Sequence, residues 1–221
     1  MIDGTPLNDE TVTVVGGGIA GLSAACTLAD AGATVTVVEQ NDQLGGVTGR
    51  LEVDGFTFDT GPSWYMMPET FERFFGHFDR SVDDYYELER LDPQYRVFYK
   101  DGDRVDITPD LDRTRRLFES YEEGAADALD DYLDSAARTF EIGMERFVYT
   151  DRSRLRDLID PEIIQAAPAL KHLGSMQSFV EGYFENPKLQ QLLQYTLVFL
   201  GGSPHDTPSL YHLMAHVDFE R

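Results

Sequence analysis

The sequence predicts an α/β protein that begins with a βαβ unit and continues through a strand-rich insertion into a helical region. The apolar runs Thr11–Val15 and Thr34–Val38 indicate strands, and the apolar segment between them has the length of a helix. Short alternating segments follow, and helical periodicity with acidic polar faces then dominates. We therefore expect one part over residues 1–108 and a helical part over residues 109–221.

The turn between the first strand and the helix has the pattern Gly-x-Gly-x-x-Gly. Its first glycine permits a tight turn, the second lets a pyrophosphate approach the backbone, and the third lets the helix pack closely on the sheet. The N-terminus of the helix then offers N–H groups and a positive dipole end to phosphates. The predicted phosphate-contacting residues are Gly16, Gly17, Gly18, Ile19, Ala20 and Gly21.

An acidic residue, Glu39, ends the second strand and is followed by Gln40. Its carboxylate is placed to accept hydrogen bonds from ribose hydroxyls, and its charge would repel a 2′-phosphate. A glycine turn between strand and helix, with an acid at the tip of the next strand, is the fingerprint of a Rossmann-like dinucleotide-binding domain. The sequence therefore favours FAD or NAD over NADP.

The composition is strongly acidic, with 40 acidic residues against 18 basic ones and a net charge of −22 in 221 residues. This charge argues against nucleic acid as a partner, because phosphates would be repelled. Acids spread along the chain, with only three lysines, are typical of a halophilic protein whose surface self-repulsion is screened by salt. The single cysteine, Cys26, excludes an internal disulfide, fits a reducing cytoplasm and is expected to pack in the core.

Targeting and membrane-spanning segments are not predicted. The first ten residues are polar and acidic, unlike a secretory signal, and no apolar run is long enough to cross a bilayer. We therefore expect a cytoplasmic protein.

Turn signals divide the remaining chain into elements. A hairpin is predicted over 50–59 around Asp54-Gly55, and a helix over 69–78 after Pro68. The other expected strands are 86–91, 95–100 and 104–108, and the other expected helices are 111–121, 124–149, 161–167, 175–184, 187–200 and 208–219. Only two strong parallel-strand candidates are present, where the doubly wound fold has about five or six, so we expect a chain truncated at its C-terminus.

Histidine and phenylalanine residues are further candidates for a site. His212 and His216 are four apart on a predicted helix, but the glutamate of a His-Glu-x-x-His motif and a third ligand are missing, so packing histidines are favoured over a metal site. The phenylalanine stripe at 71, 74, 75 and 78 favours core packing. No catalytic nucleophile arrangement is recognisable.

The chain resembles the phytoene desaturase and carotenoid desaturase family, within the flavin-containing amine oxidase superfamily. The resemblance extends over essentially the whole sequence. The matching segments are Gly16–Gly21, Glu39, Gly45-Gly46, Asp54–Ser63, Met67–Glu69, Leu88–Arg96, Lys100–Gly102 and Gly201–Pro204.

The resemblance implies FAD as the cofactor and hydride transfer to the flavin from a hydrophobic polyene such as phytoene. Glu39 would hold the adenosine ribose, and Gly45 and Gly46 would approach the pyrophosphate and ribityl region. The segment Gly61, Pro62 and Ser63 would lie near the isoalloxazine ring. The resemblance also implies a quinone or oxygen as electron acceptor and peripheral contact with the cytoplasmic membrane.

The chain departs from the family pattern at Val47, where members usually carry an arginine directly after the Gly-Gly pair. Arg50 is the candidate to replace that charge. Residues 64–67 either form a wall of the substrate channel or belong to the core, and the phenylalanine stripe has a polyene tunnel as its alternative role. The apolar stretch 163–173 is either a bundle helix or a membrane-surface helix.

Other functions stay open at this point. Flavin enzymes of the superfamily that modify other carotenoids, retinoids or amines share the same nucleotide motifs. A flavin-free escort protein that binds isoprenoid groups is a further alternative, although Glu39 with an intact glycine turn argues against it. The sequence does not identify the catalytic acid or base.

Overall fold

A computed structural model describes residues 6–61, 64–149 and 174–220, which fall into two compact units, Met1–Tyr86 and Glu87–Arg221. This division lies earlier than the predicted boundary at residue 108 because the strands around 95–107 pack with the helices. Val105 and Ile107 are fully buried in the core of the second unit. Each unit is described by itself below.

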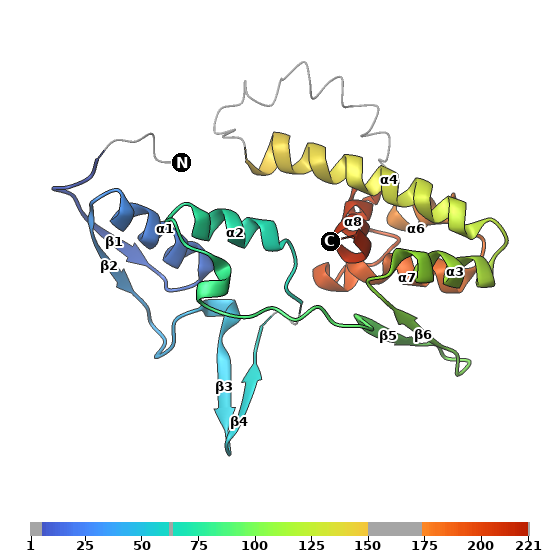
Figure 1. Ribbon diagram of the computed structural model, residues 1–221, viewed down its shortest axis with the longest axis horizontal. Helices are drawn as coiled ribbons and strands as arrows, with labels where there is room; N and C mark the ends of the chain where they lie inside the picture. Colours follow the sequence, from blue (N-terminus) through green and yellow to red (C-terminus); the bar gives the residue numbers. More distant parts are fainter. Residues whose placement is uncertain (1–5, 62–63, 150–173, 221) are drawn as a thin grey trace. The chain divides into compact units, whose positions relative to one another are not determined.

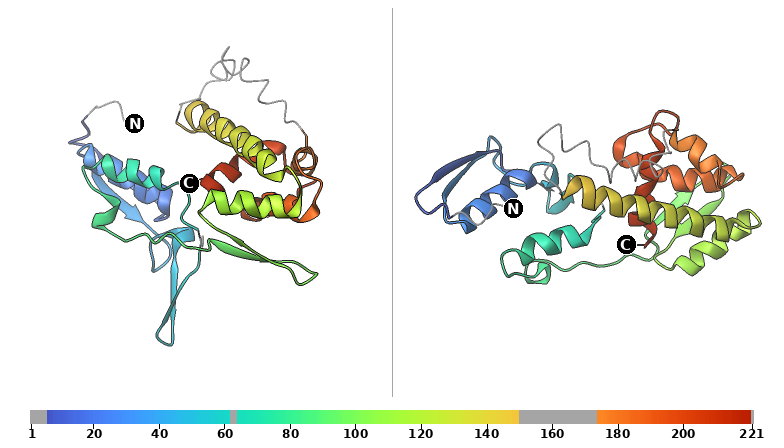
Figure 2. Two further views of the ribbon diagram at one scale, coloured as in Figure 1. Left: turned by 45° about the vertical axis from the view of Figure 1, so that its right-hand side comes forward. Right: turned by 90° about the horizontal axis from the view of Figure 1, so that it is seen from above.

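The first unit begins with the predicted βαβ arrangement of β1 (Thr11–Val15), α1 (Ile19–Asp30) and β2 (Thr34–Val38). The strands are parallel and in register from Thr11 opposite Thr34 to Val15 opposite Val38. Helix α1 lies along one face of the pair (Figures 1 and 2). The opposite face is exposed, and Val15 and Val38 at the strand ends retain 85% and 50% of their accessible surface.

The predicted hairpin consists of β3 (Arg50–Val53) and β4 (Phe56–Asp59), which form a separate antiparallel ribbon (Figure 1). Asp54 and Gly55 both have positive φ, 51° and 83°, as a two-residue turn that follows the strand twist requires. The pairing Leu51 with Phe58 and Val53 with Phe56 puts four apolar side chains on one face, and all four are exposed.

Helix α2 (Pro68–Gly76) follows, with Pro68 in its first turn as predicted. The predicted strand 86–91 is wrong. A 3₁₀ turn, Val82–Asp84, closed by a capping box between Ser81 and Asp84, precedes this segment, which has no partner strand within the described chain. Tyr86 and Leu88 alternate with Glu87 and Glu89 as in a strand, but Leu88 stays 51% exposed and no strand pairs with the segment, so the pattern alone did not suffice.

The second unit consists of the hairpin β5–β6 and a helical layer built around the long helix α4. Helices α3 and α8 pack against α4 (Figures 1 and 2). The core lies between them, with Phe118, Tyr132 and Leu193 fully buried. The element bounds are β5 (Tyr95–Phe98), β6 (Arg104–Ile107), α3 (Leu111–Tyr121), α4 (Ala125–Gly143), α6 (Met176–Glu181), α7 (Pro187–Gln194) and α8 (Met214–Glu220).

Several predicted helices change type before they end. The helix expected to reach residue 149 becomes a π-helix over Met144–Val148, and α7 continues as a 3₁₀ helix over Tyr195–Leu200 until Gly201 adopts a left-handed conformation. The helix expected from residue 208 starts as a 3₁₀ helix, Ser209–Leu213, before α8. The predicted helix 161–167 and the stretch 163–173 lie outside the described residues.

Two further observations bear on the sequence predictions. Cys26 is exposed on α1, so the expectation that it packs in the core is wrong, since α1 turns Ala25 rather than Cys26 toward the sheet. Among the described residues, no helix has both the length and the apolarity needed to cross a membrane.

Candidate dinucleotide-binding site

The glycine turn joins β1 to α1 with the geometry that a dinucleotide-binding turn needs. Gly16 has φ +103°, and its N–H donates to the Val38 carbonyl at 2.8 Å, which ties the turn to β2. A Cβ on Gly21 would lie 2.0 Å from the Gly16 carbonyl oxygen, so only glycine permits this close approach. Gly18 caps α1 without a side chain, which leaves the first-turn N–H groups beside Ile19 and Ala20 available to an anion.

The carboxylate of Glu39 connects the two strand ends. Its Oε2 accepts a hydrogen bond from the Gly17 N–H at 2.6 Å, and its Oε1 accepts from the backbone and side-chain nitrogens of Asn41, both at 2.9 Å. The Asn41 N–H, and next the Gly17 N–H, lower the pKa of Glu39. A carboxylate has about four acceptor positions, so one remains for a ribose hydroxyl.

A second glycine segment packs directly on the first. The Gly45 N–H donates to the Gly17 carbonyl at 2.8 Å, and Gly45 and Gly46 have φ +110° and +60°. A Cβ on Gly46 would lie 3.1 Å from the Gly18 Cα, which is closer than side-chain atoms normally approach. The two predicted glycine groups are therefore brought together by backbone contacts.

Gly61 adds a third glycine to this arrangement. A Cβ there would lie 1.8 Å from the Val47 carbonyl oxygen, so the chain after β4 packs on the segment that follows Gly46. Pro62 and Ser63 lie outside the described residues. We call Gly16–Gly18, Gly45–Gly46 and Gly61 the glycine cradle.

Two other predicted residues are placed less favourably. The Arg50 guanidinium pairs with Glu52 across 3.1 Å on the exposed hairpin, so a charged partner other than a cofactor already binds it. Gln40 is exposed after β2, and Val47 keeps 75% of its surface accessible beside the cradle. An exposed valine therefore stands at the position where the family pattern has an arginine.

Two residues that contact Glu39 or the glycine cradle are not predicted from the sequence. Asn41 binds the Glu39 carboxylate, and Leu44 lies over Gly17, where a Cβ would approach the leucine Cδ2 to 2.4 Å. The position of Asn41, two residues after the acid, is a usable signal because it brings both the N–H and the side-chain amide of Asn41 within reach of the carboxylate.

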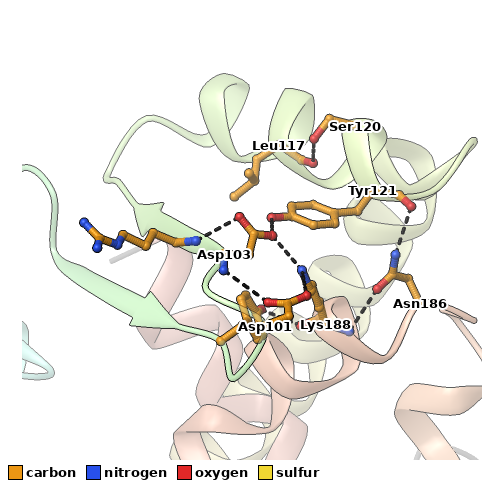
Figure 3. Close-up of polar contacts among 9 residues, drawn as sticks. Asp101, Asp103, Leu117, Ser120, Tyr121, Asn186 and Lys188 are labelled. Carbon is orange, nitrogen blue, oxygen red and sulfur yellow. Dashed lines mark hydrogen bonds and ion pairs between the residues drawn. The ribbon is translucent and has the colours of Figure 1, made fainter.

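The second unit contains a polar cluster that the sequence did not reveal (Figure 3). The Lys188 Nζ lies 2.7 Å from carboxylate oxygens of both Asp101 and Asp103, and the Tyr121 hydroxyl donates to Asp103. Hydrogen bonds from Lys188 and then Tyr121 lower the pKa of Asp103 to about 2. The Lys188 pKa is raised mainly by hydrogen bonds to Asp101 and Asp103, so the lysine stays charged. The cluster thereby attaches the turn between β5 and β6 to α3, through Tyr121, and to α7, through Lys188.

His212 and His216, the two histidines four residues apart, both pack against aromatic or polar neighbours in the second unit. His212 is fully buried, with its Nδ1 2.8 Å from the Ser209 carbonyl and its Nε2 3.0 Å from the Ser135 hydroxyl, and the ring of His216 packs on Phe140. Among the described residues, no group of three or more His, Cys, Asp or Glu side chains is arranged to hold a metal ion.

The family model for an NAD(P)-binding Rossmann-like domain matches residues 14–81, which contain the whole cradle. This match agrees with the predicted dinucleotide-binding fold. Among solved structures, a mutant putrescine oxidase superposes with a TM-score of 0.60 and 20% identity, covering 94% of this chain and 41% of its own. That likeness shows a shared fold.

Two curated proteins share more sequence identity with the chain than this solved structure does. The carotenoid 3,4-desaturase of Haloarcula japonica is 61% identical over 96% of this chain, and the 4,4′-diapophytoene desaturase of Staphylococcus aureus strain COL is 31% identical over 94%. The chain spans 43% and 41% of the length of these two proteins. It therefore spans less than half the length of either protein. By sequence the chain belongs to the carotenoid desaturase family.

Proposed function

We propose that this chain forms the nucleotide-binding part of an FAD-dependent oxidoreductase that desaturates a carotenoid. The observation that supports this most is the glycine cradle with Glu39, which combines a phosphate-binding helix N-terminus with a ribose-binding carboxylate. The sequence relationship to carotenoid desaturases directs the proposal to FAD and to a polyene substrate.

The cradle fits a dinucleotide because a Cβ on Gly16 or Gly18 would meet no close neighbour, so that this space is left for a ligand, while the other glycines let the backbone segments pack closely. The pyrophosphate would lie on the backbone of Gly16–Gly18 and Gly45–Gly46, at the N-terminus of α1. The free acceptor position of Glu39 would take a ribose hydroxyl, and its charge would exclude a 2′-phosphate. Gly61, Pro62 and Ser63 would lie near the isoalloxazine ring, and Arg50 would contribute only after leaving Glu52.

A bound flavin would supply the hydride acceptor for an allylic C–H bond, since the resulting cation is delocalised along the conjugated chain, and a base or water would take the proton from the adjacent carbon so that the double bond forms. The task of this chain's own residues is then to bind, orient and keep water away. That division of tasks accounts for the absence of a recognisable nucleophile arrangement in the sequence. We further propose a quinone or oxygen as electron acceptor and a cytoplasmic protein in peripheral contact with the membrane, where a polyene resides.

The relative with the higher sequence identity suggests which carotenoid is the substrate. The 61% identical relative is named a 3,4-desaturase, whereas the phytoene-type relative is 31% identical. A second candidate function is therefore 3,4-desaturation of a carotenoid that is already conjugated, in place of desaturation of phytoene itself.

The test uses protein expressed from the complete reading frame and reconstituted with FAD. It is incubated in liposomes with phytoene or, separately, with an already conjugated carotenoid, and the products are followed by absorbance. Longer conjugation with either substrate supports the proposal and selects between the two desaturations. A colourless protein that binds isoprenoid but no flavin would establish the escort alternative instead.

Cofactor choice is tested on the same protein by titration with FAD and with NADP. The variant Glu39→Gln keeps one acceptor oxygen but removes the charge, so FAD binding should weaken about tenfold and discrimination against a 2′-phosphate should decrease. Asp42→Asn is the matched control, because Asp42 is an exposed acid of the same loop. Equal effects of the two substitutions would remove Glu39 from the proposed site.

A further inference from the structure

Aromatic rings lie in contact along α2 and the segments directly before and after it. We define the aromatic surface as Tyr65, Phe71, Phe74, Phe75, Tyr85 and Tyr86. The helical members are spaced three and four apart, so they share one side of α2. The expected core packing of this stripe is incomplete, because within the described first unit no residue of α2 is fully buried.

The rings form a continuous surface. Tyr65 lies 4.6 Å from Phe71 and 5.9 Å from Tyr86, measured between ring centroids, and Phe75 lies 4.8 Å from Tyr85. The rings of Tyr65 and Tyr85 also face solvent, with 39% and 59% of their surfaces accessible. An exposed aromatic surface of this kind is typical of a binding site for an apolar partner.

Two tyrosine hydroxyls of the surface are hydrogen-bonded to each other. The hydroxyl oxygens of Tyr65 and Tyr86 lie 2.6 Å apart, so one phenol donates to the other. Burial, and then this hydrogen bond, raise the pKa of Tyr65 above its ordinary value, so the Tyr65 phenol stays uncharged. The surface therefore presents ring faces and C–H edges, which suit a hydrocarbon better than a polar ligand.

The aromatic surface is continuous with the cradle along the chain. Tyr65 follows Gly61 by four residues, and the Gly61 backbone packs on Val47 at the end of the second glycine segment. Four residues span at most about 14 Å, so the Cα of Tyr65 lies within that distance of the Cα of Gly61.

We propose that the aromatic surface binds the conjugated hydrocarbon chain of the carotenoid substrate, an inference that rests on the function proposed above. A polyene is flat, long and without charge, and its π-face packs well on tilted aromatic rings. Trp64 directly precedes the surface and is the only tryptophan of these 221 residues. The difference in fluorescence between the protein and its Trp64→Phe variant therefore reports ligands that bind there.

The experiment measures binding without turnover on the full protein in detergent. Lycopene, a coloured polyene, is titrated while Trp64 fluorescence is followed, and squalane serves as a saturated, non-absorbing competitor. We compare Phe75→Leu and Tyr85→Leu, which replace a ring by an apolar side chain, with Phe56→Leu on the exposed hairpin as the matched control. Tyr85 is the more exposed ring, so its replacement leaves folding least disturbed.

We expect lycopene to quench Trp64 saturably, and each ring variant to weaken the apparent affinity about three- to tenfold, because ring contacts are worth that much in packing. Phe56→Leu should leave the affinity unchanged, and FAD affinity should be the same in all variants. Absence of saturable quenching, or equal affinities in all four proteins, would overturn the inference and indicate that the rings pack against other parts of the polypeptide. Since desaturation and FAD binding are measured separately, that outcome leaves the proposed function standing.

Discussion

Asp218 on α8 is a carboxyl group whose removal should stabilise the protein. Burial raises its pKa from 3.8 to about 6, and the hydrogen bond from the Tyr95 hydroxyl at 2.8 Å opposes this only in part. The Gln94 side chain donates to the Asp218 carbonyl rather than to the carboxylate. Within the described part of the chain, no salt bridge to Asp218 offsets the cost of burying its charge.

The size and sign of the effect follow from the two pKa values. Because the folded state binds the proton more tightly, the free energy of unfolding falls as pH rises from about 4 to about 6 and is constant above that range. A difference of about two units corresponds to about 3 kcal/mol at neutral pH. Asp218→Asn removes the charge but keeps an oxygen for Tyr95, so the variant should be about 3 kcal/mol more stable at about pH 7.5 and only about 1 kcal/mol more stable at about pH 4.5.

Urea unfolding at fixed, high potassium chloride measures this difference, with far-UV circular dichroism as the signal and both proteins examined at both pH values. Asp131→Asn is the control, because Asp131 is an exposed acid on α4. A gain of equal size at both pH values would mean that the stabilisation does not come from titration of Asp218. A loss of stability at neutral pH would refute the account of a costly buried charge.

Three further outcomes are expected. Gly21→Ala should abolish dinucleotide binding, because its Cβ would lie 2.0 Å from the Gly16 oxygen, whereas Gly76→Ala, with open space around its Cβ, should stabilise α2 by about 1 kcal/mol in thermal unfolding. Glu122→Ala should cost about 1–2 kcal/mol in urea unfolding, because the Glu122 carboxylate accepts the N–H groups of Glu185 and Asn186 before α7, and Glu122→Gln should cost less. Lys188→Met should lower the melting temperature more in dilute than in molar salt, since its ion pairs with Asp101 and Asp103 are partly exposed to screening ions; a salt-independent effect would show that lost packing dominates.

Local patterns made much of the first unit predictable. The alternation of threonine and valine in β1 and β2, the glycine turn and the proline at the start of α2 each act within a few residues. The Asp54-Gly55 turn likewise has both positive φ values that its sequence demands. The segment 86–91 had a similar local pattern but no neighbouring strand, and strand formation depends on a partner that the pattern does not contain.

Contacts between distant residues account for what the sequence did not predict. Lys188 binds carboxylates 85 and 87 residues earlier in the chain, and the Glu122 carboxylate caps a segment 63 residues later. Each pair consists of common surface residue types, so nothing in their spacing singles them out. For the same reason the hairpin β5–β6 belongs to the second unit and not to the first part predicted from the sequence. Its burial depends on helices that follow it in the chain.

Glu39 shows how a local prediction left out part of what a residue does in the structure. The sequence predicts it as a ligand of the ribose, yet two of its contacts in the structure are to the backbone of Gly17 and Asn41. Together with the Gly45 N–H bond to Gly17, these contacts fix the cradle before any nucleotide arrives. A pre-organised site loses less conformational freedom on binding, so part of the contribution of Glu39 to affinity would come from ordering the protein. For this reason Glu39→Gln should weaken FAD binding even where the ribose hydroxyl keeps its acceptor.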